Sequence, residues 1–467
     1  VICINGVTDI VLQSSVPGST LTWTVSSAPA VTWIAGKAPA GGTGVIGTVI
    51  GQNLQHTGSS PVTVTYSITP AGPASTFCPG PAVTRNVVVN PTAELNDPSD
   101  QTVCNGSASA AVNFTTNRTG GVTTYSWTNS NTSIGLGASG SGNLPSFTAI
   151  NAGTSPVSAT ITVTPSFEGC PGTPQTFTIT VNPSAQVNDP ADQVHCAGTA
   201  VPVLAFTTNR TGGTTTYAWT NSNTAIGLAA SGSGSLPAFT ATNGGTSPIS
   251  ATITVTPTFT NGGQSCSGTP QTFTIAVNPS AQVNDPADQV HCTGTAVPAL
   301  GFTTNRTGGT TTYAWTNSNT TIGLAASGSG SLPAFTATNG GTAPVTATIT
   351  VTPTFTNGGQ SCSGTPQTFT ITVNPSAQVN DPADQVRCNN AAVPALTFTT
   401  NRTGGTTTYA WTNSNTAIGL GASGTGNLPA FAATNGGTSP ISATITVTPT
   451  FTNGGQSCSG TPQTFTI

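Results

Sequence analysis

The sequence predicts an all-β protein: a tandem array of five β-sandwich modules forming an extended rod. Three observations support this prediction. A block of about 96 residues recurs almost letter for letter, with TNRTGGTTTYAWTNSNT at 208–224, 304–320 and 400–416, and a close variant at 116–132. Apolar and polar residues alternate with a period of two, which is typical of half-buried strands. The chain also contains 55 glycines and 36 prolines at short intervals, which is the pattern of short strands joined by turns.

The strands can be followed within one repeat. At 251–256 and 272–277, apolar residues point to one face and mainly threonines to the other. Tyr217 and Trp219 share a face of a further predicted strand at 215–220. These segments are rich in β-branched and aromatic residues, which favour strands. No segment keeps a helical period, so frequent short strands predict a sandwich.

The repeats divide the chain into modules. A chain of 467 residues exceeds what one hydrophobic core usually serves. We expect a divergent first module followed by four similar ones, at residues 1–91, 92–183, 184–279, 280–375 and 376–467. The first residues match the middle of a later repeat, and the last ones fall inside an expected strand. We therefore expect a piece of a longer, processed protein.

Composition excludes several functions. Charged residues are only 4% of the chain, against about 25% in ordinary soluble proteins. Hydrophobic residues are 35%, which argues against disorder. A net charge of −4 with scattered arginines argues against nucleic-acid binding, which needs clustered cations. No apolar run approaches the roughly 20 residues that span a bilayer, so we expect no membrane contact from this sequence.

Ten cysteines alternate between long and short spacings, two to a module: Cys3, Cys78, Cys104, Cys170, Cys196, Cys266, Cys292, Cys362, Cys388 and Cys458. We predict one disulfide inside each module, pinning its first strand to its last hairpin: Cys3–Cys78, Cys104–Cys170, Cys196–Cys266, Cys292–Cys362 and Cys388–Cys458. The alternative pairs neighbours across the short gaps and leaves Cys3 and Cys458 over. Metal binding is less favoured, because no CxxC motif or histidine cluster accompanies the cysteines. Disulfides indicate an oxidising, extracellular location at the cell surface.

The segments between modules, such as 181–192, carry two prolines and no glycine, so we predict short, stiff joints. They contain most of the acidic residues: Asp97, Asp100, Asp189, Asp192, Asp285, Asp288, Asp381 and Asp384. The favoured interpretation is a turn at Asn188-Asp189-Pro190. A calcium site is a weaker hypothesis, since calcium wants six to eight oxygens. A third is an ion pair with the arginine of the NRTGG turn: Arg118, Arg210, Arg306 or Arg402.

We expect no enzyme. The three histidines are His56, His195 and His291, and the position of the last two is occupied by Arg387 in the fifth module. Catalytic chemistry does not tolerate such a change. We predict one core tryptophan in each module: Trp23, Trp127, Trp219, Trp315 and Trp411. The alternative is that Tyr217 and Trp219 form a sugar-stacking platform.

The order Cys196, Trp219, Cys266 is similar to that of immunoglobulin domains. The pattern DQVHCAG…TTYAWTNSNTAIGL…ATITVTP…CSGTPQTFTITVNP resembles the PKD-like, immunoglobulin-like repeats of large bacterial cell-surface adhesins. Those adhesins serve gliding motility and are exported by the type IX system. The resemblance covers residues 92–467 in four copies and the first module more distantly. It implies a structural or adhesive role.

Three functions remain open at this point. The first is a stiff spacer or multivalent stalk of a secreted adhesin, with extracellular surfaces or glycans and other modules of the same long chain as its partners. The second is a subunit of an extracellular filament or matrix. The third is a carbohydrate-binding array of a secreted enzyme. No cofactor is expected, with calcium at the joints as the less favoured alternative.

Overall fold

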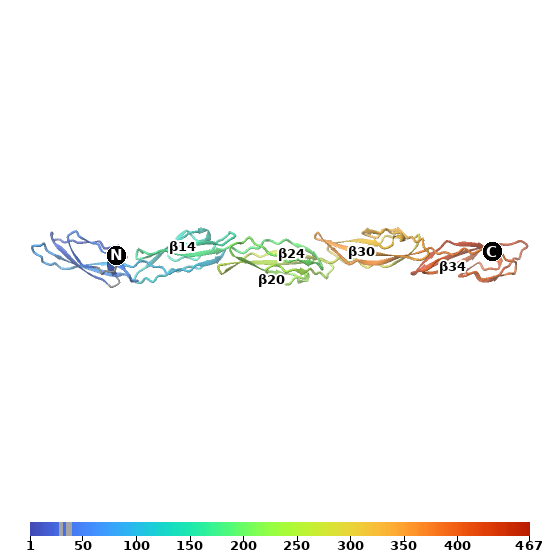
Figure 1. Cartoon of the computed structure of the whole chain (residues 1–467), viewed down its shortest axis with the longest axis horizontal. Coiled ribbons are helices and arrows are strands. Elements are labelled where there is room, and N and C mark those ends of the chain that lie inside the picture. Colours follow the sequence, from blue (N-terminus) through green and yellow to red (C-terminus); the bar gives the residue numbers. More distant parts are fainter. Residues whose placement is uncertain (28–30, 34–39) are drawn as a thin grey trace.

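The computed structural model describes residues 1–27, 31–33 and 40–467, and these form five modules placed end to end in a straight rod (Figure 1). Each module is a β-sandwich of the immunoglobulin type, and the described residues contain no helix longer than a three-residue 3-10 turn. The predicted fold class, an all-β tandem array in an extended rod, is confirmed.

The third module shows the arrangement most completely. Its elements are β17 (Gln193–Cys196), β18 (Ala200–Val201), β19 (Thr214–Asn221), η2 (Thr224–Ile226), β20 (Ser231–Ser233), β21 (Phe239–Thr240), β22 (Ile249–Asn261), β23 (Gln264–Ser267) and β24 (Gln271–Asn278). One sheet has the order β17-β24-β22-β19-β20, with β23 also paired to β22. The short pair β18-β21 forms the opposite layer. All these pairings are antiparallel except β17 with β24, which run parallel.

The other repeats follow the same plan. The second module contains β11 (Gln101–Cys104), β12 (Thr123–Asn129), η1 (Thr132–Ile134), β13 (Ser139–Ser141), β14 (Val157–Phe167), β15 (Cys170–Pro171) and β16 (Gln175–Asn182). The fourth contains β25 (Gln289–Cys292), β26 (Ala296–Val297), β27 (Thr310–Asn317), η3 (Thr320–Ile322), β28 (Ser327–Ser329), β29 (Phe335–Thr336), β30 (Val345–Asn357), β31 (Gln360–Ser363) and β32 (Gln367–Asn374).

The two end modules keep the main sheet. The fifth contains β33 (Ala392–Val393), β34 (Thr406–Asn413), η4 (Thr416–Ile418), β35 (Ser423–Thr425), β36 (Phe431–Ala432), β37 (Thr444–Asn453), β38 (Gln456–Ser459) and β39 (Gln463–Thr466). The first contains β1 (Ile2–Cys3), β2 (Gly6–Val7), β3 (Ile10–Val11), β4 (Thr20–Ser26), β5 (Val31–Trp33), β6 (Gly42–Val45), β7 (Val49–Ile50), β8 (Asn53–His56), β9 (Val62–Ala71) and β10 (Val83–Asn90). Its main sheet has the order β1-β10-β9-β4-β6.

The hairpin between β22 and β23 extends from one end of the module. Its two turn residues, Gly262 and Gly263, have φ values of 57° and 73°, as a two-residue turn compatible with strand twist requires. In the second module the hairpin is four residues shorter, and Glu168 and Gly169 make the turn with φ values of 47° and 83°. The cysteine follows the turn in both cases, so Cys266 and Cys170 lie near the tip of their hairpins.

The segment predicted as a stiff joint belongs to the following module. Ala185 and Val187 are 4% and 1% exposed, and Val187 is part of the core of the third module. Asn188 donates its backbone N–H to the carbonyl of Thr207 at 2.8 Å. Residues 184–192, which form no strand, therefore belong to the third module and lead into β17, and the true junction is at Asn182-Pro183.

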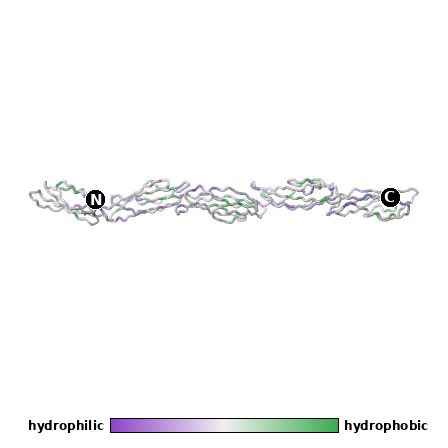
Figure 2. Tube along the Cα trace, in the orientation of Figure 1, coloured by the Kyte–Doolittle hydropathy of each residue, from purple (hydrophilic) through white to green (hydrophobic). Residues whose placement is uncertain are grey.

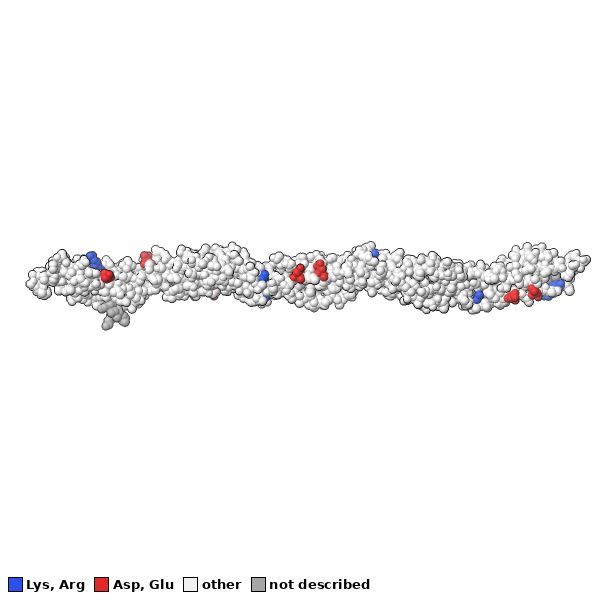
Figure 3. All heavy atoms as spheres, turned by 90° about the horizontal axis from the view of Figure 1, so that it is seen from above, with Lys and Arg blue, Asp and Glu red and all other residues white. Residues whose placement is uncertain are grey.

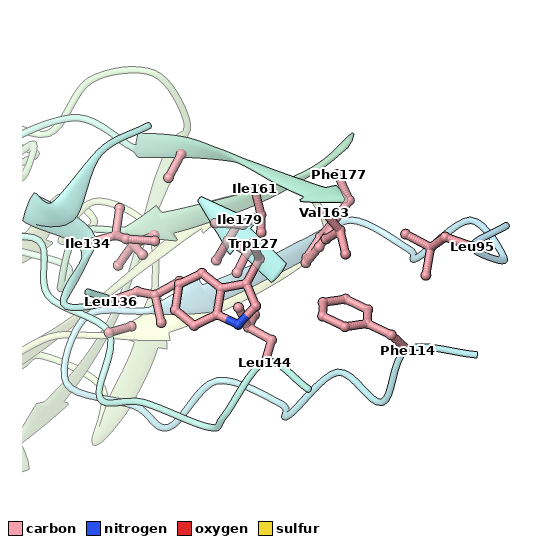
Figure 4. Close-up of a cluster of buried hydrophobic side chains, with 13 residues drawn as sticks. Leu95, Phe114, Trp127, Ile134, Leu136, Leu144, Ile161, Val163, Phe177 and Ile179 are labelled. Atoms are coloured by element: carbon pink, nitrogen blue, oxygen red, sulfur yellow. The ribbon is translucent and has the colours of Figure 1, made fainter. Parts of the chain in front are cut away.

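The core of each module is built around one tryptophan. Figure 4 shows Trp127 of the second module among Leu136, Leu144 and Ile179. Trp127, Trp219, Trp315 and Trp411 are 3–6% exposed, and Trp23 is partly buried against the core of the first module. Each ring covers a glycine on the neighbouring strand. In the third module, for example, Trp219 lies opposite Gly232.

This close packing gives a first prediction. A Cβ atom on Gly232 would lie 2.3 Å from Cζ2 of Trp219, and Gly328 and Gly424 are placed in the same way. Alanine at all three positions should lower the unfolding free energy of each affected module by about 1–3 kcal/mol, because the core is overpacked. Denaturant unfolding followed by tryptophan fluorescence measures the change.

The matched control is alanine at Gly244, Gly340 and Gly436, where a Cβ would have no atom within 4 Å and φ is not positive. Equal midpoints for the two triple variants would contradict the packing argument.

The surface is nearly uncharged. Figure 3 shows a few isolated acidic and basic side chains on the face drawn, and Figure 2 shows polar and apolar residues mixed through every module. Among the described residues no helix is long and apolar enough to cross a membrane.

Candidate functional site

The described residues contain no recognisable catalytic centre. No group of three or more His, Cys, Asp or Glu side chains comes together there. A pocket of about 300 Å³ at the end of the fifth module has Arg387 as its only charged lining residue. His195 lies against Gln193, with Nε2 at 2.9 Å from Oε1, and partial burial lowers its pKa. The distinctive chemistry of this chain lies instead at the interfaces between modules.

Disulfides join each module to the next. They are Cys3–Cys170, Cys104–Cys266, Cys196–Cys362 and Cys292–Cys458, with Cα–Cα distances of 5.3–5.5 Å. The predicted pairing within modules (Cys3–Cys78, Cys104–Cys170, Cys196–Cys266, Cys292–Cys362, Cys388–Cys458) is therefore wrong. The alternative across the short gaps is also wrong. Cys78 and Cys388 are free and exposed.

Strand direction explains the pairing. Because β17 runs parallel to β24, Cys196 lies opposite Asn278 at the far end of that strand. Cys266 lies in the hairpin before β24 begins, twelve residues earlier in the chain. Twelve residues of strand span about 40 Å, whereas a disulfide needs Cα atoms within about 7 Å. Cys196 instead faces the hairpin of the next module, which carries Cys362.

A pair of asparagines, one fully buried and one partly buried, closes each of the last three interfaces. Asn278, at the end of β24, has no exposed surface. Its Nδ2 donates to the backbone oxygen of Asn357 at 2.9 Å, and Nδ2 of Asn357 donates back to Oδ1 of Asn278 at 3.0 Å. Asn182 with Asn261 and Asn374 with Asn453 form the same pair. Each module's last strand is thereby held to the next module's hairpin.

The arginine of each NRTGG turn makes a second contact across the interface. Arg306 donates from Nη1 to the carbonyl of Gly245 in the preceding module at 2.8 Å, and Arg118, Arg210 and Arg402 do the same to Gly58, Gly153 and Gly341. The predicted ion pairs with the aspartates are therefore wrong. Arg118 also pairs with Glu94, with Nη2 at 3.4 Å from Oε2.

Glycines permit the close approach of the two modules. Gly308, in the same turn as Arg306, has a φ of 75°, and a Cβ there would lie 2.9 Å from Cδ of Pro248 in the preceding module. Gly358 at the hairpin tip lies against Val194, with 3.1 Å between an added Cβ and Cγ2. At both contacts, the turn that contains Gly308 and the hairpin that contains Gly358, the backbone of the fourth module therefore lies directly against side chains of the third module.

The aspartates pair with backbone groups of the last strand. Oδ1 of Asp192 accepts the N–H of Thr274 at 2.6 Å, and Asp100, Asp288 and Asp384 accept from Thr178, Thr370 and Thr466 in the same way. No turn forms at 188–190, where the chain is extended. The predicted Asx turn is therefore wrong. The exposed Asp97, Asp189, Asp285 and Asp381 precede them by three residues.

These hydrogen bonds predict a pH dependence. The backbone N–H of Thr274, and then its side chain, lower the pKa of Asp192, and the same holds for Asp100, Asp288 and Asp384. A carboxyl with a lowered folded pKa stabilises the fold above its unfolded pKa. That contribution should disappear as the pH falls from about 4 through the lower folded value.

Denaturant unfolding between pH 5 and pH 2 should show this loss. Asparagine at Asp100, Asp192, Asp288 and Asp384 should remove much of the pH dependence, whereas asparagine at Asp97, Asp189, Asp285 and Asp381 should leave it. The same pH profile for both quadruple variants would argue against the assignment.

The aromatic residues do not form an exposed platform. Trp219 is 3% exposed, and Tyr217 stacks in a tilted arrangement on Phe206, with ring centroids 5.6 Å apart. The same pair recurs as Phe114–Tyr125, Phe302–Tyr313 and Phe398–Tyr409. Burial raises the pKa of Tyr217. Trp219 therefore belongs to the core, and the partly buried Tyr217 and Phe206 pack against it.

A family model described as PKD-like domain matches residues 1–93 and 101–185, which are the first two modules in tandem. The matched ranges end within a few residues of the module boundaries seen in the structure. A comparison with curated protein sequences gives no match.

A comparison with solved structures finds matches among multidomain extracellular proteins. The human Desmocollin-1 ectodomain is 10% identical, with 98% of this chain and 95% of that chain covered and a TM-score of 0.26. The Protocadherin GammaB4 extracellular domain is 13% identical, with coverages of 100% and 82% and a TM-score of 0.28. Sidekick-1 immunoglobulin domains 1–5 are 11% identical, with coverages of 100% and 96% and a TM-score of 0.22. At these values the similarities carry no functional argument.

Proposed function

We propose that this chain is a stiff spacer segment of a large extracellular adhesive protein. The observation that carries the proposal is the construction of the interfaces. Domains in one chain usually move relative to each other unless their interface is large. Here each interface holds a disulfide and an arginine contact, and three of the four also hold a reciprocal asparagine pair.

The chemistry of the chain fits an extracellular stalk. Four disulfides between modules persist only in an oxidising environment. Repetition of nearly identical modules offers any weakly binding surface several times, and multivalency raises apparent affinity without a strong single site. A connection to gliding-motility adhesins and to type IX export rests on the sequence resemblance alone.

Small-angle X-ray scattering of the oxidised full chain tests the spacer role. Five modules with strands of up to 13 residues, such as β22, should give a rod about 200 Å long with a uniform cross-section. Alanine at Arg210, Arg306 and Arg402 should broaden the distribution of lengths. A wide range of bent shapes in the unchanged, oxidised chain would contradict the proposal.

A filament subunit is the second candidate, and one observation favours it. The outer face of the main sheet carries threonines from three adjacent strands, including Thr216, Thr254 and Thr272, and the chain has few charged residues that could repel a neighbouring copy. Low charge favours association. Sedimentation at rising concentration separates the candidates, since a spacer stays as isolated rods and a filament subunit forms ordered fibres.

A further inference from the structure

The inter-module disulfides have a consequence for tension along the rod. We infer that they convert the chain into two continuous covalent tethers that are already extended in the folded state, so that the rod bears load without lengthening. The inference concerns mechanical force, and it holds or fails independently of any adhesive role.

The first tether can be followed from Cys3. It crosses the Cys3–Cys170 disulfide, follows residues 170–196, crosses Cys196–Cys362 and follows residues 362–388. The second tether crosses Cys104–Cys266, follows residues 266–292 and crosses Cys292–Cys458. Each 26-residue segment starts at the hairpin end of one module and finishes at the far end of the next.

These segments have little slack. Residues 170–196 comprise β15, β16, residues 183–192 (which form no strand) and β17, and this described segment contains no turn, helix or residue with positive φ. Residues 266–292 have the same character, and residues 362–388 also contain no turn, helix or positive φ but have no strand after β32. A chain in strand conformation is already close to its maximum length of 3.3–3.6 Å per residue. Pulling on a tether therefore loads disulfides and extended backbone before any sandwich can unravel.

The two tethers are also bound to each other. In the third module the first tether supplies β17 and the second supplies β24, which pair in parallel from Gln193 opposite Ile275 to Cys196 opposite Asn278. In the fourth module the tethers exchange these two positions, with β25 of the second tether on β32 of the first. In the second module β16 of the first tether pairs with β11, which ends at Cys104, where the second tether begins. The rest of each sandwich is attached to the side of this parallel strand pair. Force along the tethers is therefore carried by the pair and is not transmitted through the hydrophobic core.

Single-molecule pulling on the full chain tests the inference. The amino terminus provides one attachment and the exposed thiol of Cys388 the other, with Cys78→Ser present to leave one free thiol. The first tether between these points contains about 54 residues and two disulfides, so the oxidised chain should stop extending at about 200 Å without unfolding steps. Full reduction should raise the limit to about 1,350 Å.

Two matched variants locate the load. Serine at Cys196 and Cys362 breaks the first tether and should raise the limit to about 590 Å, because the shortest covalent route then passes through the bodies of two modules. Serine at Cys104 and Cys266 breaks only the second tether and should leave the limit at about 200 Å.

Several outcomes would overturn the inference. With Cys78→Ser present, disulfides inside the modules would give a limit of about 650 Å in the oxidised chain, and both serine variants would then lengthen it further. Stepwise unfolding of modules in the oxidised chain before the limit would show that the tethers are slack. If a serine variant fails to fold, the extension limit of the unchanged protein can be compared before and after reduction of its disulfides.

Discussion

Removing the disulfide between Cys196 and Cys362 should cost more stability than any other change at the interfaces. This bond closes a loop of 166 residues, for which the chain-entropy model gives about 5 kcal/mol. The other three disulfides already restrict the unfolded chain, so about 5 kcal/mol is the upper value. Serine at both positions should lower the thermal unfolding midpoint of the third and fourth modules, which calorimetry of the full chain can measure.

The chain supplies its own control for this experiment. Cys78 and Cys388 occupy the equivalent hairpin and strand positions but are free and exposed. Serine at these two positions should leave the unfolding profile unchanged. A loss of stability as large as that from Cys196 and Cys362 would show that the stabilisation does not come from the cross-link.

Alanine at Asn278 should have the second largest effect. Its side chain is fully buried, and its removal leaves both the backbone oxygen and the side-chain amide of the partly buried Asn357 without their partner. Each of these two lost hydrogen bonds should cost about 1–2 kcal/mol, so the loss for this interface should be about 2–4 kcal/mol. Unfolding of the full chain, with a double-mutant cycle against Asn357→Ala, isolates the coupling.

The first interface provides the comparison for this prediction. Asn90 occupies the same position as Asn278, but its amide reaches only the carbonyl of Glu168 at 3.5 Å and meets no second asparagine. Asn90→Ala should therefore cost about 1 kcal/mol. Equal losses at Asn90 and Asn278 would remove the special role assigned to the asparagine pair.

Much of the fold could be predicted from the sequence. Apolar and polar residues alternate in 251–256 because every second side chain of a strand faces the core. In the structure, β22 shows this alternation of buried and more exposed residues along its length. The glycine pair before Cys266 identified a hairpin, because both turn residues need positive φ. Tryptophan was expected in the core because few other large residues are available to fill it.

The disulfide pairing could not be predicted in the same way. Strand patterns place Cys196 on a first strand, but they do not give its direction relative to the last strand. The parallel pairing of β17 and β24 puts Cys196 at the end opposite to Cys266. A pairing that leaves no cysteine free was also a misleading guide. When each module is linked to the next, one cysteine of the first module and one of the fifth have no partner within these five modules, and these are Cys78 and Cys388.

The interface residues were missed for a related reason. Asn90, Asn182, Asn278 and Asn374 each precede a proline at the end of a strand, and the sequence alone suggested only a short, stiff joint there. Their burial depends on the next module's hairpin, which is about 80 residues away in the chain. The recurrence of an Asn-Pro pair at this one position in four modules was the available signal.

The most direct test of this account is the disulfide connectivity itself. The oxidised chain should be cleaved with a protease that does not depend on lysine and arginine, and the cross-linked peptides identified by mass spectrometry without reduction. We predict peptides joining Cys104 to Cys266 and Cys196 to Cys362, with Cys78 and Cys388 recovered as free thiols. Peptides joining Cys104 to Cys170 or Cys196 to Cys266 would contradict the interlocked rod.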